Sequence, residues 1–246
     1  MLISDLWLVI PCFNEETRLD VDAFLEFLSG APDARLCFVN DGSTDGTGAV
    51  LSGIQKQYPD NISVQTLPAN QGKAEAVRVG ILHGLAHSDK GCVGYWDADL
   101  ASPFNQLKLF DAEADSGDWR LLMGCRHQRL GTDIRRKAGR HYLGRCFATL
   151  VSQLLKLPVY DTQCGAKIFR TDAARVLFAQ PFLSPWVFDV EILARFIEAF
   201  GKRAVMESIR EVPLSQWHDV NGSKLSFAAC ANSMADLCRI KRTYNL

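Results

Sequence analysis

Two carboxylates stand one residue apart directly after a short apolar run of this chain. The run Cys-Val-Gly-Tyr-Trp at 92–96 is followed by Asp97 and Asp99, with an alanine between them. A short apolar run predicts a buried strand, and open α/β sheets bind ligands beyond the carboxyl ends of their strands. Carboxylate oxygens suit Mg2+ or Mn2+, which share substrate phosphates. The pair therefore predicts a metal–diphosphate site, with a solvated turn as the alternative.

Polar residues also follow the first two apolar runs of the chain. Pro11, Asn14 and Glu15 come after the first run, and Asp41 opens the segment Asp-Gly-Ser-Thr-Asp-Gly-Thr at 41–47. Taken alone, these residues are also typical of a helix entry and of turn and N-cap positions.

Two common nucleotide-binding patterns are missing. No G-x-G-x-x-G follows the first apolar run, and Gly72-Lys73-Ala74 lacks both the first glycine and the hydroxyl residue of a G-x-x-x-x-G-K-[ST] loop. The sequence therefore argues against a nicotinamide oxidoreductase and against a P-loop enzyme.

A basic stretch lies near the middle of the chain. Between Arg126 and Arg145 there are six Arg and one Lys against a single acid, Asp133. If residues 135–155 form a helix, Arg136, Arg140 and Gly144 share one face. Guanidinium groups bind phosphate through two parallel hydrogen bonds and keep their charge. The stretch predicts a phosphate site, with a solvated basic face as the alternative.

Alternating strands and helices must position these residues. Apolar runs predict five strands in the first half, at 6–10, 36–39, 62–67, 92–96 and 119–124, with helices between them at 19–28, 44–58, 71–87 and 103–114. The second half predicts helices at 135–155 and 188–200 and strands at 165–169 and 204–212. This order predicts an α/β domain with a Rossmann-like, mostly parallel mixed sheet flanked by helices.

Composition narrows the class of protein. With 246 residues, 48% hydrophobic and 22% charged, the chain fits one soluble globular domain, and a net charge of -1 argues against nucleic-acid binding. The eight cysteines include no C-x-x-C pair, which favours reduced thiols and a cytoplasmic location. No run approaches the roughly 20 apolar residues of a membrane span, so we expect membrane contact from the cytoplasmic face only, as a peripheral protein.

Taken together, the motifs resemble a known family. Ile10-Pro11-Cys12-Phe13-Asn14-Glu15-Glu16, the 41–47 segment, Asn70-Gln71-Gly72-Lys73 and Asp97-Ala98-Asp99 resemble family 2 glycosyltransferases of the GT-A fold. Later strings resemble the polyprenyl-phosphate glycosyltransferase branch that contains dolichyl-phosphate β-glucosyltransferase. These strings are Gly124-Cys125-Arg126, Asp161-Thr162-Gln163-Cys164-Gly165-Ala166-Lys167-Ile168-Phe169, Trp186-Val187-Phe188-Asp189-Val190-Glu191 and Gly222-Ser223-Lys224.

The resemblance implies a role for each matching position. It implies one GT-A domain over 1–246, with a nucleotide-sugar-binding half at 1–124 and an acceptor-binding half at 125–246. Pro11, Asn14, Glu15, Asp41 and Lys73 would bind the nucleotide, Asp97 and Asp99 the metal, and Arg126 and Arg140 the acceptor phosphate, with Arg136 on the same face. Gln163, Asp189 and Glu191 would lie in the sugar and catalytic region. Ala101 stands where mannosyl members often have a metal-binding Gln, so no third protein ligand is expected.

Two aromatic or apolar features remain open between function and packing. Trp186 is a candidate to stack on a sugar or to line the acceptor groove, with packing as the alternative. A helical stripe near the carboxyl end precedes basic residues and predicts either contact with an anionic membrane or docking on the domain's own core. The stripe is Phe227, Cys230, Ala231, Met234, Leu237 and Cys238, and the basic residues are Arg239, Lys241 and Arg242.

The implied activity is transfer of a hexose, with glucose expected, from a nucleotide sugar such as UDP-glucose to a polyprenyl- or dolichyl-type lipid phosphate, with inversion. One alternative is transfer to a saccharide hydroxyl, for which Asp189 or Glu191 would serve as general base. An alternative of another class is an inactive membrane-surface binding module. The sequence leaves the hexose, the lipid and the oligomeric state open.

Overall fold

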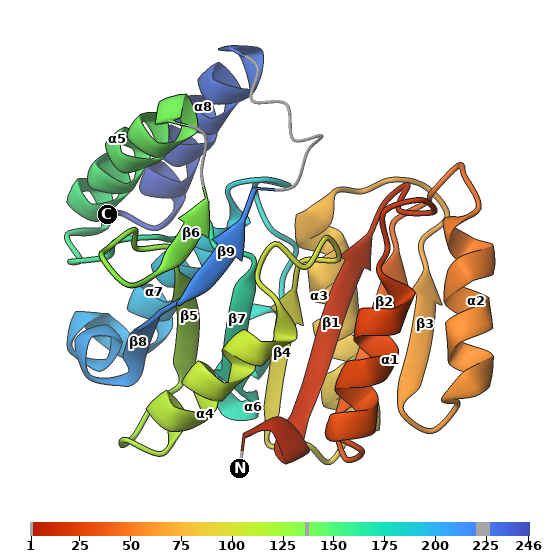
Figure 1. Cartoon of the computed structure of the whole chain (residues 1–246). Coiled ribbons are helices and arrows are strands. Elements are labelled where there is room, and N and C mark those ends of the chain that lie inside the picture. Colours follow the sequence, from red (N-terminus) through yellow and green to blue (C-terminus); the bar gives the residue numbers. More distant parts are fainter. Residues whose placement is uncertain (1, 136–137, 220–226) are drawn as a thin grey trace.

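A seven-stranded sheet runs through the computed structural model, which describes residues 2–135, 138–219 and 227–246, with the backbone alone at 138, 140, 141 and 227–231. The strand order is β3-β2-β1-β4-β7-β5-β8 (Figure 1). In that order the strands are Ile62–Thr66, Arg35–Asn40, Leu6–Cys12, Cys92–Trp96, Ala166–Arg170, Leu121–Cys125 and Ile209–Pro213. All neighbours are parallel except at β7, which is antiparallel to β4 and β5. The predicted mixed, mostly parallel sheet is confirmed.

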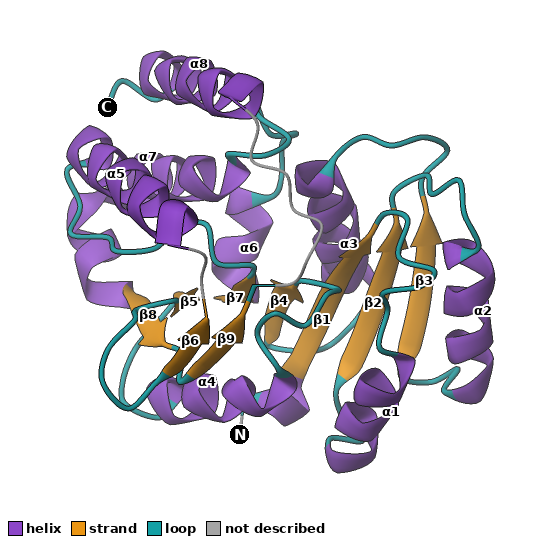
Figure 2. Ribbon diagram, turned by 45° about the horizontal axis from the view of Figure 1, so that its top comes forward, coloured by secondary structure: helices purple, strands orange, loops and turns teal. Residues whose placement is uncertain are grey.

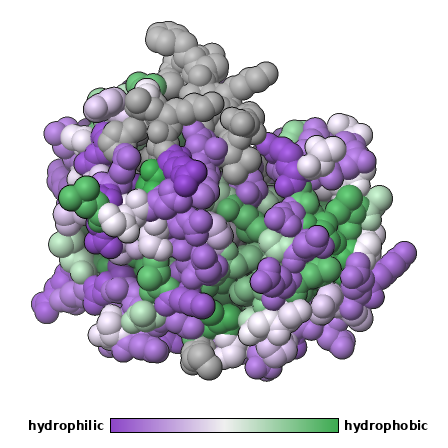
Figure 3. All heavy atoms as spheres, in the orientation of Figure 1, coloured by the Kyte–Doolittle hydropathy of each residue, from purple (hydrophilic) through white to green (hydrophobic). Residues whose placement is uncertain are grey.

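Helices cover both faces of this sheet (Figure 2). They are α1 Val21–Gly30, α2 Thr47–Gln57, α3 Lys73–His87, α4 Leu107–Ala114, α6 Thr171–Leu177 and α7 Phe188–Ser208, with short 3-10 helices η1 Ile3–Asp5 and η2 Phe104–Gln106. Trp7 and Val9 of β1 pack in the apolar cluster that holds residues of α3, α6 and α7, whereas Leu6 and Leu8 pack with α1, α2 and α4. Strand side chains alternate between faces, so a strand covered on both sides is apolar throughout. Figure 3 shows one face of the molecule, where hydrophobic residues are most extensive over the half that holds β1 to β3.

A smaller unit lies beside the main sheet. Strands β6 (Asp133–Arg135) and β9 (Gln216–His218) form a two-stranded parallel sheet. Helices α5 (Ala138–Leu155) and α8 (Phe227–Thr243) both contact α7. In the part of the chain that the structure describes, no helix is long and apolar enough to cross a bilayer.

The predicted stripe on α8 divides between core and surface. Leu237 and Ile240 are buried in the cluster that includes α7, whereas Met234 and Cys238 are exposed. Phe227, Cys230 and Ala231 have side chains outside the described residues. Core docking therefore accounts for part of the stripe.

The helix predicted over 188–200 ends where α7 breaks at Gly201 (φ 80°), and the strand predicted over 204–212 is partly wrong, because a second helical segment of α7 follows the break through Ser208 and β8 begins only at Ile209. Ala, Met and Glu at 204, 206 and 207 are good helix formers. Arg203 and Glu207 add an i, i+4 ion pair of 2.7 Å. The apolar residues that resembled a strand are therefore one turn of helix, in which Val205 is buried.

Two further differences concern α5 and α6. The helix predicted from residue 135 begins at Ala138, and Arg135 belongs to β6. The predicted site residue Arg136 lies outside the described residues. Helix α6 was not predicted, because seven residues are too few for helical periodicity to stand out.

Candidate active site

Polar loops of four strands meet at one edge of the sheet. The loops after β1, β2 and β4 leave at the carboxyl ends of parallel strands, and the loop before β7 reaches the same edge because β7 is antiparallel. There the backbone N–H of Asp97 donates to the carbonyl oxygen of Gly165 (3.0 Å). Across the sheet, the strand numbers fall from β3 to β1 and then rise to β4, so the chain connections run to opposite sides of β1. Open α/β sheets bind ligands at such a switch point.

The loops after β1 and β2 contact each other at this edge of the sheet. The Asn14 N–H donates to Ser43 Oγ (3.0 Å), and Asn14 Oδ1 accepts from the Thr44 N–H (2.9 Å). Asn14 has φ 54°, a left-handed conformation that asparagine tolerates better than most residues. Pro11 lies in β1, in register with Val39. The structure thus brings Pro11 and Asn14 to the predicted nucleotide side.

Asp41 anchors the entrance to α3. Its side chain is 3% exposed, Oδ1 accepts from the Gln71 N–H (2.7 Å) and Oδ2 accepts from the Gly72 N–H (2.9 Å). Gly72 has φ 90°, which favours glycine, and Lys73 follows as the first residue of α3. Asp41 therefore fixes the start of α3, and with it the position of Lys73, a role that the sequence did not indicate. Its predicted contact with the nucleotide stays a prediction.

Glu15, in the loop after β1, offers a buried hydrogen-bond acceptor. Its Oε1 accepts from Arg18 (2.6 Å), while Oε2 is buried with no hydrogen-bond partner among the described residues. Burial raises the pKa of this carboxyl, although Arg18 acts in the opposite direction. An unmet buried acceptor is costly, and a hydroxyl donor on a bound ligand would satisfy it.

Lys73 and the carboxylate pair meet at the end of β4. Lys73 Nζ lies 2.5 Å from Asp97 Oδ1. Burial opposes the charged form of Lys73, but the carboxylates of Asp97 and Asp189 outweigh it and raise the pKa of the amine. Burial and the charge of Asp97 raise the pKa of Asp99, whose Oδ1 accepts from the Ala101 N–H (3.1 Å). Two carboxylates are thus crowded beside one lysine.

This pair fits a divalent cation that takes its other ligands from a substrate. Among the residues that the structure describes, no group of three or more His, Cys, Asp or Glu could hold a metal ion. Mg2+ is commonly bound through one or two carboxylates together with substrate phosphates and waters. Burial and, after it, the charge of Asp97 raise the pKa of Asp99, and a bound cation would relieve the repulsion between the two carboxylates. Asp97 and Asp99 are therefore the residues that would hold it.

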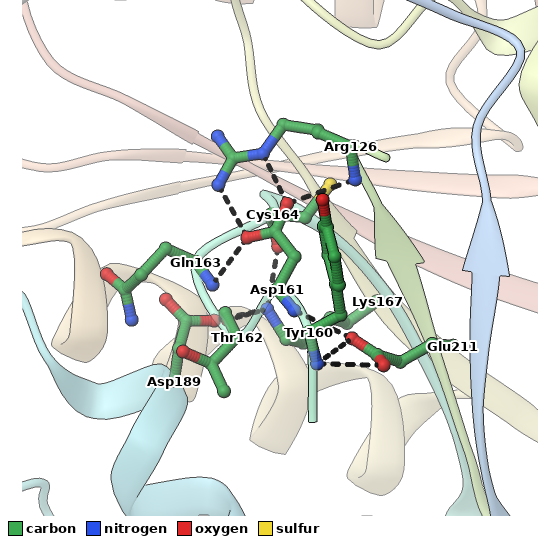
Figure 4. Close-up of polar contacts among 9 residues, drawn as sticks. All are labelled: Arg126, Tyr160, Asp161, Thr162, Gln163, Cys164, Lys167, Asp189 and Glu211. Carbon is green, nitrogen blue, oxygen red and sulfur yellow. Dashed lines mark hydrogen bonds and ion pairs between the residues drawn. The ribbon is translucent and has the colours of Figure 1, made fainter. Parts of the chain in front are cut away.

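Arg126 contacts the first residue of the segment 161–165, which we call the 161–165 loop and whose last residue contacts Asp97. Its Nε and Nη2 donate to the two carboxylate oxygens of Asp161 (2.7 and 2.8 Å), and its backbone N–H donates to Oδ2 (3.0 Å) (Figure 4). Burial opposes the charge of Arg126, but Asp161 outweighs it and raises the pKa of the guanidinium. The guanidinium also lies 5.3 Å from the centre of the Trp217 ring. Arg126 is therefore held rigidly, with Nη1 outside its pair with Asp161.

The other predicted acceptor arginines are only partly placed. Arg140 and Gly144 lie on α5, four residues apart, and the side chain of Arg140 is outside the described residues. The guanidinium of Arg145 stacks 3.7 Å from the centre of the Tyr160 ring. The sequence counted Arg145 only as part of the basic stretch, and its contact with Tyr160 could not be predicted from spacing.

Gln163 and Trp186 have unequal surroundings. The Gln163 N–H donates to Asp161 Oδ1 (3.2 Å), and its side-chain Nε2 is buried without a hydrogen-bond partner among the described residues. Trp186 is 59% exposed just before α7. Gln163 thus lies next to the Arg126–Asp161 pair with a free donor, and Trp186 remains available for stacking.

Asp189 is buried behind the 161–165 loop. It is 4% exposed, accepts from Lys167 Nζ (2.5 Å) and accepts a short hydrogen bond from the Tyr95 hydroxyl. Lys167 is fully buried and donates also to the carbonyl oxygens of Thr162 (2.8 Å) and Cys164 (2.6 Å). The carboxylate that the sequence offered as a general base is thus part of an ion pair that supports the loop.

Glu191 lies in a second buried network. It is 0% exposed, and its oxygens accept from the Leu183 N–H (2.8 Å), from Arg195 Nη2 (2.8 Å) and from the Tyr244 hydroxyl (2.9 Å). These partners belong to α7, the segment before it and the carboxyl end of the chain. The structure does not bring Glu191 together with the carboxylate pair at the end of β4, and gives it an anchoring place instead.

Comparisons with known proteins give relatives and fold neighbours. A family model described as glycosyl transferase family 2 matches residues 7–178. Dolichyl-phosphate beta-glucosyltransferase of Saccharomyces cerevisiae is 35% identical, with 98% of this chain and 75% of that protein covered. The Homo sapiens protein of that name is 33% identical, with 90% and 70% covered.

The solved structures agree in fold. Glucosyl-3-phosphoglycerate synthase from Mycobacterium tuberculosis in complex with UDP superposes with a TM-score of 0.67 at 18% identity, covering 96% of this chain and 79% of that chain. Its complex with Mn2+, UDP and glucosyl-3-phosphoglycerate has a TM-score of 0.65 at 17% identity, covering 96% and 76%. At this identity the likeness concerns the fold alone. With a family match over more than half of its length, the chain belongs to glycosyl transferase family 2.

Proposed function

We propose that this chain transfers glucose from UDP-glucose to a dolichyl-type lipid phosphate, assisted by Mg2+ or Mn2+. Relatives at 35% and 33% identity carry the name dolichyl-phosphate beta-glucosyltransferase. A neighbour of the same fold holds UDP together with Mn2+. Both facts support a UDP-sugar donor and a lipid-phosphate acceptor. The reaction is a single displacement at the anomeric carbon with inversion, which gives a β-linked sugar phosphate.

The observation that carries this proposal is the placement of opposite charges around the 161–165 loop. Asp97, which is paired with Lys73, contacts the last residue of the loop, and Arg126 contacts its first residue. An anionic donor and an anionic acceptor repel each other, so each needs its own positive charge and a fixed orientation. Arg126 supplies a charge for the acceptor, and Lys73 supplies one beside the donor diphosphate.

A phosphate acceptor also suits the state of the buried carboxylates. A phosphate monoester has a second pKa near 6, so it is largely a dianion at neutral pH and needs no strong base. A saccharide hydroxyl would need one. Asp189 and Glu191 are each engaged in a buried ion pair, with Lys167 and Arg195 respectively. This favours the lipid phosphate over a hydroxyl acceptor.

On the donor side, we assign Pro11, Asn14, Glu15 and Asp41 to the nucleotide and Asp97 and Asp99 to the cation. When bound, the cation neutralises charge on the departing diphosphate. Lys73 adds a fixed positive charge beside it, since its amine already lies 2.5 Å from Asp97. Asp41 holds the start of α3, and with it Lys73, in place.

On the acceptor side, we assign Arg126 and Arg140 to the phosphate, and Gln163 and Trp186 to the sugar and the lipid groove. Gln163 Nε2, which has no hydrogen-bond partner among the described residues, provides a donor next to the Arg126–Asp161 pair. Trp186 is 59% exposed, and a large ring with an accessible face suits a sugar or a lipid chain.

We also propose peripheral attachment to the cytoplasmic face of a membrane. Tyr142 and Leu143 of α5 are 70% and 57% exposed, and Met234 of α8 is 45% exposed. Lys241 and Arg242 lie in the last turn of α8. Exposed apolar side chains on α5 and α8, together with the basic residues of α8, suit an interface with anionic lipids, where the acceptor would reside.

The test is a transfer assay with matched donors and acceptors. Purified protein, Mn2+ and UDP-glucose are incubated with dolichyl phosphate or with dolichol, and the lipid product is identified by mass. UDP-galactose and GDP-mannose replace UDP-glucose in parallel reactions. We expect a glucosylated phospholipid from dolichyl phosphate and none from dolichol. Equal transfer to the free alcohol, or a preference for a saccharide, would refute the acceptor assignment.

A further inference from the structure

The 161–165 loop, Asp-Thr-Gln-Cys-Gly, is fixed at its first residue from two directions. Asp161 binds the side chain and the backbone of Arg126 through its carboxylate. Its own backbone N–H donates to Glu211 Oε1 (2.7 Å), and the preceding N–H of Tyr160 donates to the same carboxylate (2.9 and 3.0 Å). Figure 4 shows these contacts converging from β5, β8 and the loop. This end of the loop therefore holds Arg126 against the sheet.

The buried amine of Lys167 holds the middle of the loop through two hydrogen bonds. Lys167 Nζ donates to the carbonyl oxygens of Thr162 and Cys164 (2.8 and 2.6 Å) and pairs with Asp189 (2.5 Å). Lys167 is in β7 and Asp189 is in α7. The loop backbone is thus tied to the sheet and to a helix at the same point, which makes it a rigid spacer.

The last residue of the loop touches Asp97. The carbonyl oxygen of Gly165 accepts from the Asp97 N–H (3.0 Å). A Cβ built on Gly165 would overlap all three terminal atoms of the Asp97 carboxylate. Gly165 is not among the glycines with positive φ, so its backbone conformation suits alanine. Glycine is required here for the space that the Asp97 carboxylate occupies.

We propose that the 161–165 loop sets the separation of Asp97 and Arg126, with Gly165 as the positioning residue for Asp97 and Asp161 as the positioning residue for Arg126. The inference rests on the proposed function, since it assigns these two residues to donor and acceptor. It adds that one rigid loop holds both, so that the two anionic substrates meet at a fixed distance.

The first test separates the donor end. Gly165→Ala forces the Asp97 carboxylate to move while the backbone stays, so we expect the melting temperature to remain close to that of wild type. Calorimetry with UDP in the presence of Mn2+ should show affinity weakened by about 10- to 100-fold, as for the loss of a group that orients a metal ligand. UDP affinity without Mn2+ should change little. Wild-type UDP affinity with Mn2+ in this variant would overturn the role of Gly165.

Two further variants make the result specific. Gly53→Ala, in α2 where a Cβ meets nothing within 4 Å, is the matched control and should bind UDP with Mn2+ as wild type does. In an Asp97→Ala background the carboxylate that the new Cβ would meet is gone, so Gly165→Ala should weaken UDP binding no further. An additional loss of similar size in that background would show that Gly165 acts elsewhere.

The second test separates the acceptor end. Asp161→Asn keeps the shape of the side chain but loses the charge that holds both donors of Arg126. We expect KM for dolichyl phosphate to rise by about tenfold or more, within the range for loss of a charge-assisted hydrogen bond, with unchanged UDP affinity. A variant that loses UDP affinity and acceptor use alike would refute separate ends.

The two proposals can fail separately. UDP calorimetry needs no acceptor, so it tests Gly165 even if the wild-type protein does not glucosylate a lipid phosphate, a result that would refute the proposed acceptor alone. A wild-type protein that binds no UDP, with or without Mn2+, would overturn both.

Discussion

The donor side and the acceptor side of the sheet edge hold their charged residues in different ways. On the donor side, Asn14, Asp41 and Asp97 each come within two residues of the end of a parallel strand. On the acceptor side, Arg126 also follows a strand, but the residue that holds it, Asp161, comes 35 positions later. The donor side is therefore arranged by the sheet itself, and the acceptor side by long-range ion pairs.

The basic stretch illustrates the difference. Between residues 126 and 145 seven basic residues oppose one acid, which predicts a positive patch. In the structure Arg126 pairs with Asp161, Arg135 pairs with Asp133 (2.7 Å), and Arg145 stacks on Tyr160. An excess of charge in sequence is thus divided among separate partners in space.

The largest expected effect would break the acceptor side through its support. Asp189→Asn leaves the fully buried amine of Lys167 without its counter-charge. Removing one partner of a buried pair costs about 3–5 kcal/mol of folding free energy, which urea unfolding would measure. Asp172→Asn is the control, because its pair with Arg120 is exposed and should cost less than about 1 kcal/mol. Unchanged stability with a large loss of kcat would return Asp189 to the role of general base.

The next effect concerns the donor side and changes activity without harming the fold. Asp99→Asn should lower turnover by about 10^2-fold or more, as for removal of a main electrostatic stabiliser. Burial and the charge of Asp97 raise the folded-state pKa of Asp99 above its unfolded value. The ionised form therefore opposes folding above that pKa, and the variant should melt at or above the wild-type temperature at neutral pH. Full activity of this variant in EDTA would contradict the metal role.

Much of the donor side could be predicted from the pattern of apolar strands. Apolar runs locate β1, β2 and β4, and parallel strands place their carboxyl ends at one edge, so Asp41, Asp97 and Asp99 could be grouped before any contact was known. The hydrogen bonds of Asp41 to Gln71 and Gly72 could not, because they depend on the path of the loop before α3.

The acceptor side could be predicted only in part. Strand β7 is antiparallel within an otherwise parallel order, and periodicity carries no information on strand direction. The pairs Lys167–Asp189 and Tyr95–Asp189 join residues 22 and 94 apart. Gly165 matters for a space that only the position of Asp97 defines. A pattern of residue types cannot reveal contacts of this kind.

Substitution of the acceptor arginines tests whether the acceptor phosphate is held separately from the donor. Arg126→Ala and Arg140→Ala should reduce kcat/KM for dolichyl phosphate by about 10- to 100-fold, within the range for lost hydrogen bonds to a charged group, and leave UDP affinity nearly unchanged. Lysine at either position keeps the charge but loses the planar fork and should still impair acceptor use. Arg203→Ala, at an exposed ion pair on α7, should behave as wild type. Normal transfer by both alanine variants would contradict the acceptor assignment.

A smaller effect is expected at Asp41, which we assign to the nucleotide. Asp41→Ala removes two hydrogen bonds to the start of α3 and should weaken UDP binding by about 1–3 kcal/mol. Calorimetry measures it. Asp20→Ala, which removes the N-cap hydrogen bond of α1, lowers stability by about 1 kcal/mol and should leave UDP affinity unchanged. Equal UDP affinity in both variants would contradict the placement of Asp41 at the nucleotide.

The smallest effect concerns the basic residues at the carboxyl end of α8. Lys241 and Arg242 are exposed in the last turn of α8, and each basic residue near an anionic bilayer contributes about 1 kcal/mol to binding. Replacing each with glutamine should weaken flotation with phosphatidylserine vesicles by that amount per site, and added salt should reduce the difference because it screens surface charge. Lys56→Gln, at an exposed position of α2 beside the edge strand β3, is the matched control and should float as wild type does. Loss of flotation in the control as well would indicate nonspecific attraction. Absence of any salt-sensitive flotation in the wild-type protein would mean that α8 serves only to dock Leu237 and Ile240 on the core.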